Sequence, residues 1–144
     1  MKILVPVDGS TYSMEAVRIA SDYAKMKAAE IHLITINPYV EGLDLEISAH
    51  AMASLNESMK KRAEDVLSQA QNILSSSGVS AKATIASSTS AADEIISVAE
   101  KEKTDMIIIG NRGLGGKATR FFMGSVASKV VSLAPCSVLV VKSR

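Results

Sequence analysis

Residues 106–126 read Met-Ile-Ile-Ile-Gly-Asn-Arg-Gly-Leu-Gly-Gly-Lys-Ala-Thr-Arg-Phe-Phe-Met-Gly-Ser-Val, and this stretch decides the fold. Its apolar start, 106–109, is rich in β-branched residues and predicts a buried strand. A glycine-rich loop follows as far as Gly124-Ser125, and from Val126 the apolar spacing becomes helical. Glycines let backbone N–H groups converge on an anion, and Ser125 as an N-cap would add a helix dipole there. We expect a strand, a phosphate-binding loop and a helix; a surface loop with incidental glycines is the alternative.

The composition is that of one globular domain, which we expect to span residues 1–144. Hydrophobic residues make up 47% of the chain, but no apolar run is long enough to cross a membrane. The first apolar run is interrupted by Pro6 and Asp8, which makes it too short for the core of a secretory signal. The single cysteine, Cys136, suits a reducing compartment. We therefore expect a cytoplasmic location and no membrane partner.

The charges are balanced, with 16 basic and 15 acidic residues and a formal net charge of +1. This balance argues against a nucleic-acid partner, which needs a strongly positive surface. The basic residues of interest lie in the glycine loop: Arg112, Lys117 and Arg120. Arg112 and Lys117 either approach a phosphate or are simply solvated loop charges, and the sequence leaves both alternatives open.

The whole chain alternates predicted strands with predicted amphipathic helices. We expect strands over 2–7, 30–36, 79–86, 106–109 and 137–142. We expect helices from a cap at Ser10, Thr11 or Ser13 to about Ala28, from roughly Leu43 or Ser54 to Ser76 with Gly78 as C-cap, from a cap within 87–90 to Lys103, and from Ser125 to Leu133. Alternation with short links predicts an α/β fold whose parallel sheet is covered by helices on both faces. The strand over 79–86 alternates apolar and polar residues and is the candidate edge strand.

Ligands of such sheets bind beyond the carboxyl ends of the strands, where the strand order reverses. The strand ends that carry chemistry are Pro6-Val7-Asp8 and Gly110 onward. If the first and fourth strands are neighbours, the glycine loop faces Asp8. Taken alone, Asp8 could equally begin a turn or cap a helix.

Two well-known phosphate-binding patterns fit this loop poorly. A Walker loop would need a glycine where Asn111 stands and a Ser or Thr where Ala118 stands. Residues 113–118 satisfy a relaxed dinucleotide pattern, but that pattern belongs after the first strand and needs a later acidic residue. No Asp or Glu follows Asp105.

The remaining pattern is Gly110-x-x-Gly113, ten residues, then Gly124-Ser125. Together with the segments 5–10 (Val-Pro-Val-Asp-Gly-Ser) and 134–141 (Ala-Pro-Cys-Ser-Val-Leu-Val-Val), it resembles the universal stress protein family along the whole chain. The nucleotide-binding branch of that family has nine residues where this sequence has ten, so the loop carries one additional residue.

The resemblance implies a single open, Rossmann-like sheet of five parallel strands in the order 3-2-1-4-5, as in the adenine nucleotide alpha hydrolase-like folds. It also implies an ATP site, in which Asp8 contacts adenine or ribose and Ile36 packs on the adenine. Glycines and the start of the last helix would hold the phosphates. The implied set is Pro6, Val7, Asp8, Ile36, Ile109, Gly110, Arg112, Gly113, Gly124, Ser125 and Val126. AMP or ADP could replace ATP, and Mg²⁺ or Mn²⁺ could bridge the phosphates, although no protein ligand for a metal can be named.

Three functions stay open. The first is a stress-response module that binds ATP and regulates through its bound state. The second is a slow ATPase, or an enzyme that phosphorylates itself at Ser125 or Thr119. The third is an interaction protein that has lost nucleotide binding.

No catalytic residue is assigned, because two histidines and one cysteine do not compose a recognisable constellation. His32 is expected to be packed in a strand, His50 to face solvent, and Cys136 to be a small buried residue. The resemblance further implies a homodimer paired through the strand over 137–142, whose apolar edge would otherwise invite aggregation.

Overall fold

The computed structural model describes residues 1–39, 48–114 and 122–143. Its elements follow one another in the alternating order expected. They are β1 (Lys2–Pro6), α1 (Thr11–Lys27), β2 (Glu30–Pro38), α2 (Ala49–Ser75), β3 (Ala81–Ser88), α3 (Ala91–Glu102), β4 (Met106–Gly110), α4 (Ser125–Leu133) and β5 (Ser137–Val141).

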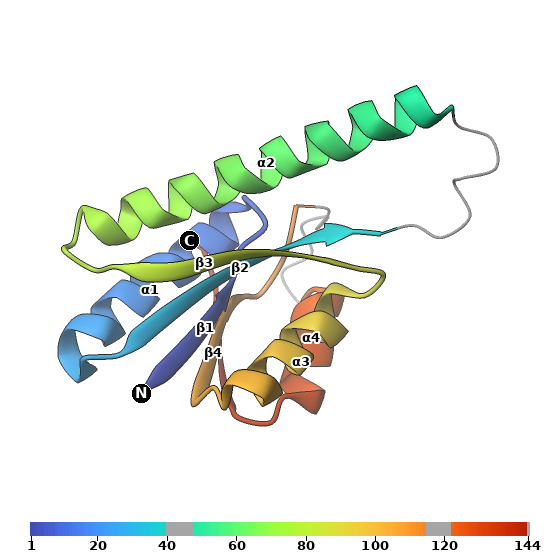
Figure 1. The fold of residues 1–144 in the computed structure, drawn as a ribbon. Helices are drawn as coiled ribbons and strands as arrows, with labels where there is room; N and C mark the ends of the chain where they lie inside the picture. Colours follow the sequence, from blue (N-terminus) through green and yellow to red (C-terminus); the bar gives the residue numbers. More distant parts are fainter. Residues whose placement is uncertain (40–47, 115–121, 144) are drawn as a thin grey trace.

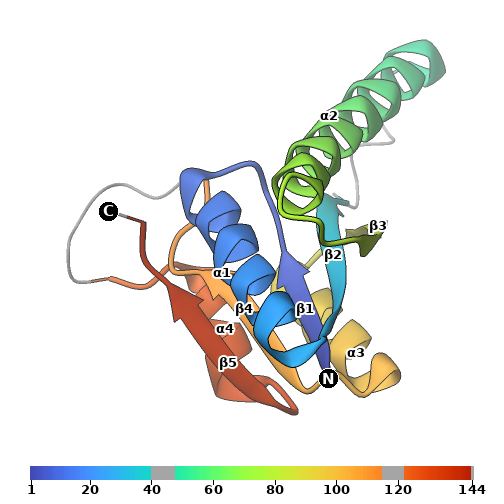
Figure 2. The same cartoon turned by 90° about the vertical axis from the view of Figure 1, so that its left-hand side faces the viewer.

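The strands form one parallel sheet in the order β3-β2-β1-β4-β5 (Figure 2). The predicted fold class and strand order are thus confirmed, and β3 lies at an edge as expected. The chain runs outward from β1 to β3 and then returns to the other side of β1 to form β4. The strand order therefore reverses between β1 and β4, where Ile3 lies opposite Met106.

The helices cover both faces of the sheet, with α1 and α2 on one side and α3 and α4 on the other (Figure 1). Successive side chains of a strand point to opposite faces, so the central strands fill two cores at once. Val5, Leu33 and Ile108 enter the core under α1 and α2. Their neighbours Leu4, Ile34 and Ile107 enter the core under α3 and α4. This explains the unbroken apolar runs of β1 and β4.

Local polar contacts decide where the helices begin. Of the three cap candidates of α1, Ser10 is the N-cap, because its hydroxyl oxygen accepts a hydrogen bond from the Ser13 N–H at 3.1 Å. Helix α2 begins behind Ser48, whose hydroxyl oxygen accepts from the Ala51 N–H. The predicted start at Ser54 was therefore too late, and the alternative start at Leu43 lies outside the described residues.

Strand ends also differ slightly from the prediction. The predicted C-cap of α2 was wrong: Ser76 is the C-cap, and Gly78, two residues later, turns the chain in the left-handed conformation with φ of 72°. The Val79 N–H then donates to the Leu74 carbonyl. That bond keeps Val79 out of the sheet, so β3 starts at Ala81. Strand β2 continues to Pro38 because β3 pairs with it as far as Ser88.

None of the helices within the described ranges is both long enough and apolar enough to cross a membrane.

The longest of these helices, α2, extends past the end of the sheet, so that its first half lies outside the layered body (Figure 1).

Candidate functional site

A cleft of about 470 Å³ lies at the carboxyl ends of β1 and β4, where the strand order reverses. All of the site residues predicted from the sequence line it, although they come from four separate parts of the chain. They are Pro6, Val7, Asp8, Ile36, Ile109, Gly110, Arg112, Gly113, Gly124, Ser125 and Val126. The volume lies within the range of small-molecule sites.

Asp8 lies in the turn between β1 and α1, where its carboxylate both stabilises the turn and lines the cleft. Its Oδ1 accepts a hydrogen bond from the Ser10 N–H at 2.9 Å, and its own N–H donates to the Ser13 hydroxyl at 3.3 Å. Its Oδ2 lies only 2.7 Å from where a Cβ on Gly113 would stand. The turn thus holds one carboxylate oxygen, and the other faces the glycine loop.

Gly110 ends β4 against the first turn of α1. A Cβ at this position would lie 2.8 Å from the carbonyl carbon of Tyr12 and 3.0 Å from the Ser13 nitrogen. Both atoms belong to the backbone, so neither can swing away. Only glycine lets the strand and the helix approach this closely, and their contact forms the floor of the cleft.

The two ends of the glycine loop are tied together. The Gly124 N–H donates to the Asn111 carbonyl at 2.7 Å, and the Arg112 Nε donates to the Phe122 carbonyl at 3.3 Å. These bonds bring Gly113 and Gly124 to the same cleft although ten residues separate them. Lys117, Thr119 and Arg120 lie outside the described residues.

Helix α4 begins at the cleft with its N-terminus. The predicted cap was wrong: Gly124 is the N-cap residue, without a side-chain bond, and Ser125 is the first helical residue. The reason is that the Ser128 N–H already bonds the Gly124 carbonyl, which draws Ser125 into the helix. The first N–H groups of an α-helix have no intrahelical acceptor, and the helix dipole favours an anion beside them.

The other side of the cleft is apolar and was largely missed from the sequence. The additional lining residues are Ser13, Ile34, Ala91, Ile95, Leu114 and Ala127. Ile34 precedes Ile36 by two residues, so strand alternation could have identified it. Ala91 and Ile95 come from α3, which reaches the cleft only because it packs on the same face as α4. Nothing in their local sequence indicated this.

The cleft joins a polar end to an apolar one. Asp8 and Arg112 are the charged side chains among its described lining residues. They lie with the glycines, whereas the isoleucines of β2 and α3 form the opposite wall. Such a cleft suits a ligand with a flat apolar group and an anionic tail.

The other residues considered from the sequence lie elsewhere. His32 is buried, with both ring nitrogens hydrogen-bonded, and His50 is exposed. Cys136 is half-buried beside the core under α3 and α4, and burial, together with the charge of Asp105, raises the pKa of its thiol. Within the described ranges, no group of three or more His, Cys, Asp and Glu side chains could hold a metal ion.

Comparison with known proteins gives consistent results. The family model described as "Universal stress protein family" matches residues 1–142. The universal stress protein MJ0531 of Methanocaldococcus jannaschii is 35% identical over 144 residues, covering 98% of this chain and 81% of that protein.

Solved structures give the same result for the fold. The universal stress protein UspA from Lactobacillus plantarum superposes with a TM-score of 0.81 at 26% identity, covering 98% of this chain and 97% of that one. The universal stress protein from Archaeoglobus fulgidus, solved in complex with dAMP, has a TM-score of 0.70 at 22% identity and covers 99% and 98% of the two chains.

Proposed function

The chain belongs to the universal stress protein family, and on that premise we propose that it binds an adenine nucleotide, ATP above all, and acts as a nucleotide-dependent regulatory module. One observation carries this proposal. Glycines that are far apart in the sequence meet the N-terminus of α4 at one end of a cleft whose other end is apolar. The dAMP held by the Archaeoglobus fulgidus relative is a ligand of this kind.

The proposed orientation follows from the chemistry of the two ends. The adenine lies on the isoleucine wall formed by Ile34, Ile36 and Ile95. The ribose lies beside Asp8, whose carboxylate accepts from hydroxyl groups. The phosphates lie at Gly113 and at the start of α4, where unpaired N–H groups and the helix dipole stabilise negative charge. Oxygens of the phosphates would supply ligands for an accompanying Mg²⁺ or Mn²⁺ ion.

Calorimetric titration of the protein with ATP and Mg²⁺, and in a second experiment with AMP, tests the proposal. The wild type should bind ATP with a micromolar dissociation constant. Gly113→Asp and Gly124→Asp should each abolish binding, because a carboxylate at either position fills the phosphate space and repels the ligand. Gly78→Asp is the matched control, since it adds the same charge at a position with no neighbour within 4 Å and outside the cleft.

Two outcomes would contradict the proposal. If the wild type binds no nucleotide, the interaction-protein alternative takes its place. If both cleft variants bind as well as the wild type, the nucleotide site lies elsewhere. Phosphate release measured in the same samples decides whether the protein is also a slow ATPase.

We also propose that two copies pair through β5, at an edge of the sheet. The Val141 carbonyl accepts from the Asn111 N–H, so Val141 faces the neighbouring part of the chain. By strand alternation, the N–H of Val140 faces the open edge. Proline there removes the outward donor and part of the Val140 packing against the core under α3 and α4, but no hydrogen bond to β4. Val140→Pro should therefore convert a dimer into a folded, somewhat less stable monomer in sedimentation experiments. A wild type that sediments as a monomer would refute the pairing.

A further inference from the structure

Helix α3 connects two distant parts of the molecule. Its first residue, Ala91, and Ile95 line the cleft described above. Its last residue, Glu102, lies about 16 Å further along the helix axis, at a rise of about 1.5 Å per residue. There it lines a different cavity, of about 670 Å³, at the amino ends of β1, β2 and β3.

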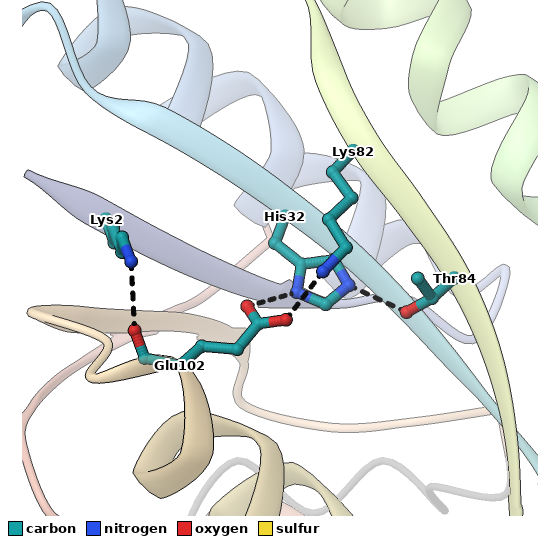
Figure 3. Close-up of polar contacts among 5 residues, drawn as sticks. All are labelled: Lys2, His32, Lys82, Thr84 and Glu102. Carbon is teal, nitrogen blue, oxygen red and sulfur yellow. Dashed lines mark hydrogen bonds and ion pairs between the residues drawn. The ribbon is translucent and has the colours of Figure 1, made fainter.

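Glu102 joins α3 to three strands (Figure 3). Its Oε2 accepts from His32 Nδ1 on β2 at 2.8 Å, and its Oε1 accepts from Lys82 Nζ on β3 at 2.7 Å. Its backbone carbonyl accepts from Lys2 Nζ on β1 at 3.2 Å. Every oxygen of the residue thus fixes the end of the helix to the sheet.

The imidazole of His32 is itself held in place. Because a carboxylate only accepts, Nδ1 carries the hydrogen that His32 donates to Glu102. The other ring nitrogen, Nε2, is hydrogen-bonded to the Thr84 hydroxyl on β3 at 2.7 Å. Only a tenth of the His32 side chain is exposed, so its bond to Glu102 is shielded from water. It is more buried than the Lys82–Glu102 ion pair, in which 60% of the lysine side chain is exposed.

The apolar contacts of α3 fix its position along the sheet less well. Its buried residues are Ala92, Ile95 and Ala99, and Val98 is partly buried against the same core. Two of the three buried residues are alanines, which have no side chain beyond Cβ to interlock with the sheet. The Asp93–Lys129 ion pair joins α3 to α4, but 59% and 45% of those side chains are exposed, and such pairs hold geometry weakly.

We infer that Glu102 is a positioning residue for the nucleotide cleft, an inference that rests on the proposed function. By anchoring the last residue of α3, it sets how far the helix reaches toward the cleft and so where Ala91 and Ile95 stand against the adenine. Without the carboxylate, only the Lys2 bond to the backbone carbonyl remains, so the helix shifts along its contact with the sheet and the apolar wall no longer matches the ring. Small displacements of a binding wall are costly because the contacts are short-ranged.

Two measurements on Glu102→Ala test this inference. In the nucleotide-free protein, the methyl NMR signals of Ala91 and Ile95 should move, although these residues lie at the far end of the helix. The dissociation constant for Mg-ATP should rise roughly 3- to 30-fold, the usual range of long-range coupling. Glu102→Gln should lose less affinity, because its amide oxygen still accepts from His32.

Ile31→Val is the matched control. Ile31 is buried beside His32 in β2 but packs against the helices of the opposite face. Its variant should lower the melting temperature and leave both the Ala91 and Ile95 signals and the affinity within about twofold of wild type. If Glu102 only stabilised the fold, Glu102→Ala would likewise lower the melting temperature and leave the two methyl signals and the affinity unchanged.

The inference is overturned if Glu102→Ala leaves the methyl signals in place, or if it binds Mg-ATP within twofold of the wild type. If Glu102→Ala does not fold, Glu102→Leu, whose side chain likewise accepts no hydrogen bond from His32 or Lys82, carries the same test with the same criteria. A wild type that binds no nucleotide removes the proposed function, and the positioning role with it. If the wild type and Glu102→Ala bind nucleotide equally well, the proposed function stands and only the positioning role is refuted.

Discussion

Replacing Gly110 by alanine tests whether the contact between β4 and α1 builds the floor of the cleft. The added Cβ would lie 2.8 Å from two carbon atoms of Tyr12 and 3.0 Å from the Ser13 nitrogen. Comfortable carbon–carbon contacts begin at about 3.5 Å, so strand and helix must separate by several tenths of an ångström. The strand is held in the sheet by pairing with β5, so the first turn of α1 is the part that moves.

The expected cost is that of overpacking, about 1–3 kcal/mol. For a chain of this length, this corresponds to a fall in melting temperature of roughly 3–10 °C. The displaced turn carries Ser13, whose hydroxyl accepts from the Asp8 N–H. Nucleotide affinity should therefore fall together with stability, and calorimetry of unfolding and of ATP binding measures both.

Gly78→Ala separates the two effects. Gly78 also requires glycine, because of its φ of 72°, but a Cβ there meets nothing within 4 Å. Its variant should lose about 1 kcal/mol through backbone strain alone and keep its nucleotide affinity. A Gly110→Ala protein that melts within about 1 °C of the wild type and binds ATP unchanged would refute the reasoning from the contact distances.

Three further predictions concern single side chains. Ser10→Ala removes the N-cap of α1 and should cost about 1 kcal/mol, or roughly 3 °C, in thermal unfolding; an unchanged melting temperature would contradict the capping role. Burial opposes ionisation of Glu102, but hydrogen bonds from Lys82 and His32 outweigh it and hold the pKa of its carboxyl below the ordinary 4.5. Its contribution to stability is therefore complete above pH 4.5 and is lost as the pH falls through the lowered pKa, so denaturant titrations of wild type and Glu102→Gln should differ at pH 7 and converge in acid. The raised pKa of the Cys136 thiol predicts slower alkylation by iodoacetamide at pH 7.5 than that of a free thiol, and an equal rate would count against it.

Much of the fold could be predicted because its signals are local. In the apolar runs around Leu4, Ile34 and Ile107, successive side chains fill the cores on both faces of the sheet. The alternation of apolar and polar residues in β3 predicted an edge strand, and β3 lies at an edge. The strand order itself came from the family resemblance. The predicted site residues meet in one cleft because the carboxyl ends of parallel strands share one edge of the sheet.

The errors lie where a contact between distant residues overrides a local signal. Serine is a better cap than glycine in isolation, and so Ser125 was predicted as the N-cap of α4. In the folded chain the Gly124 N–H bonds the Asn111 carbonyl across the loop, and Gly124 takes the cap position instead. That bond joins residues that are thirteen positions apart, so no short pattern contains it.

The sequence by itself determined the elements, the two-faced core and the residues at the strand ends, because each depends on side-chain spacing within one segment. Only the tertiary structure decided that Ala91 and Ile95 complete the wall of the cleft, and that Glu102 joins α3 to β1, β2 and β3. Both depend on which helix lies against which strands. That packing is fixed by burial of apolar surface across the whole domain, and its free energy does not belong to any single stretch of the chain.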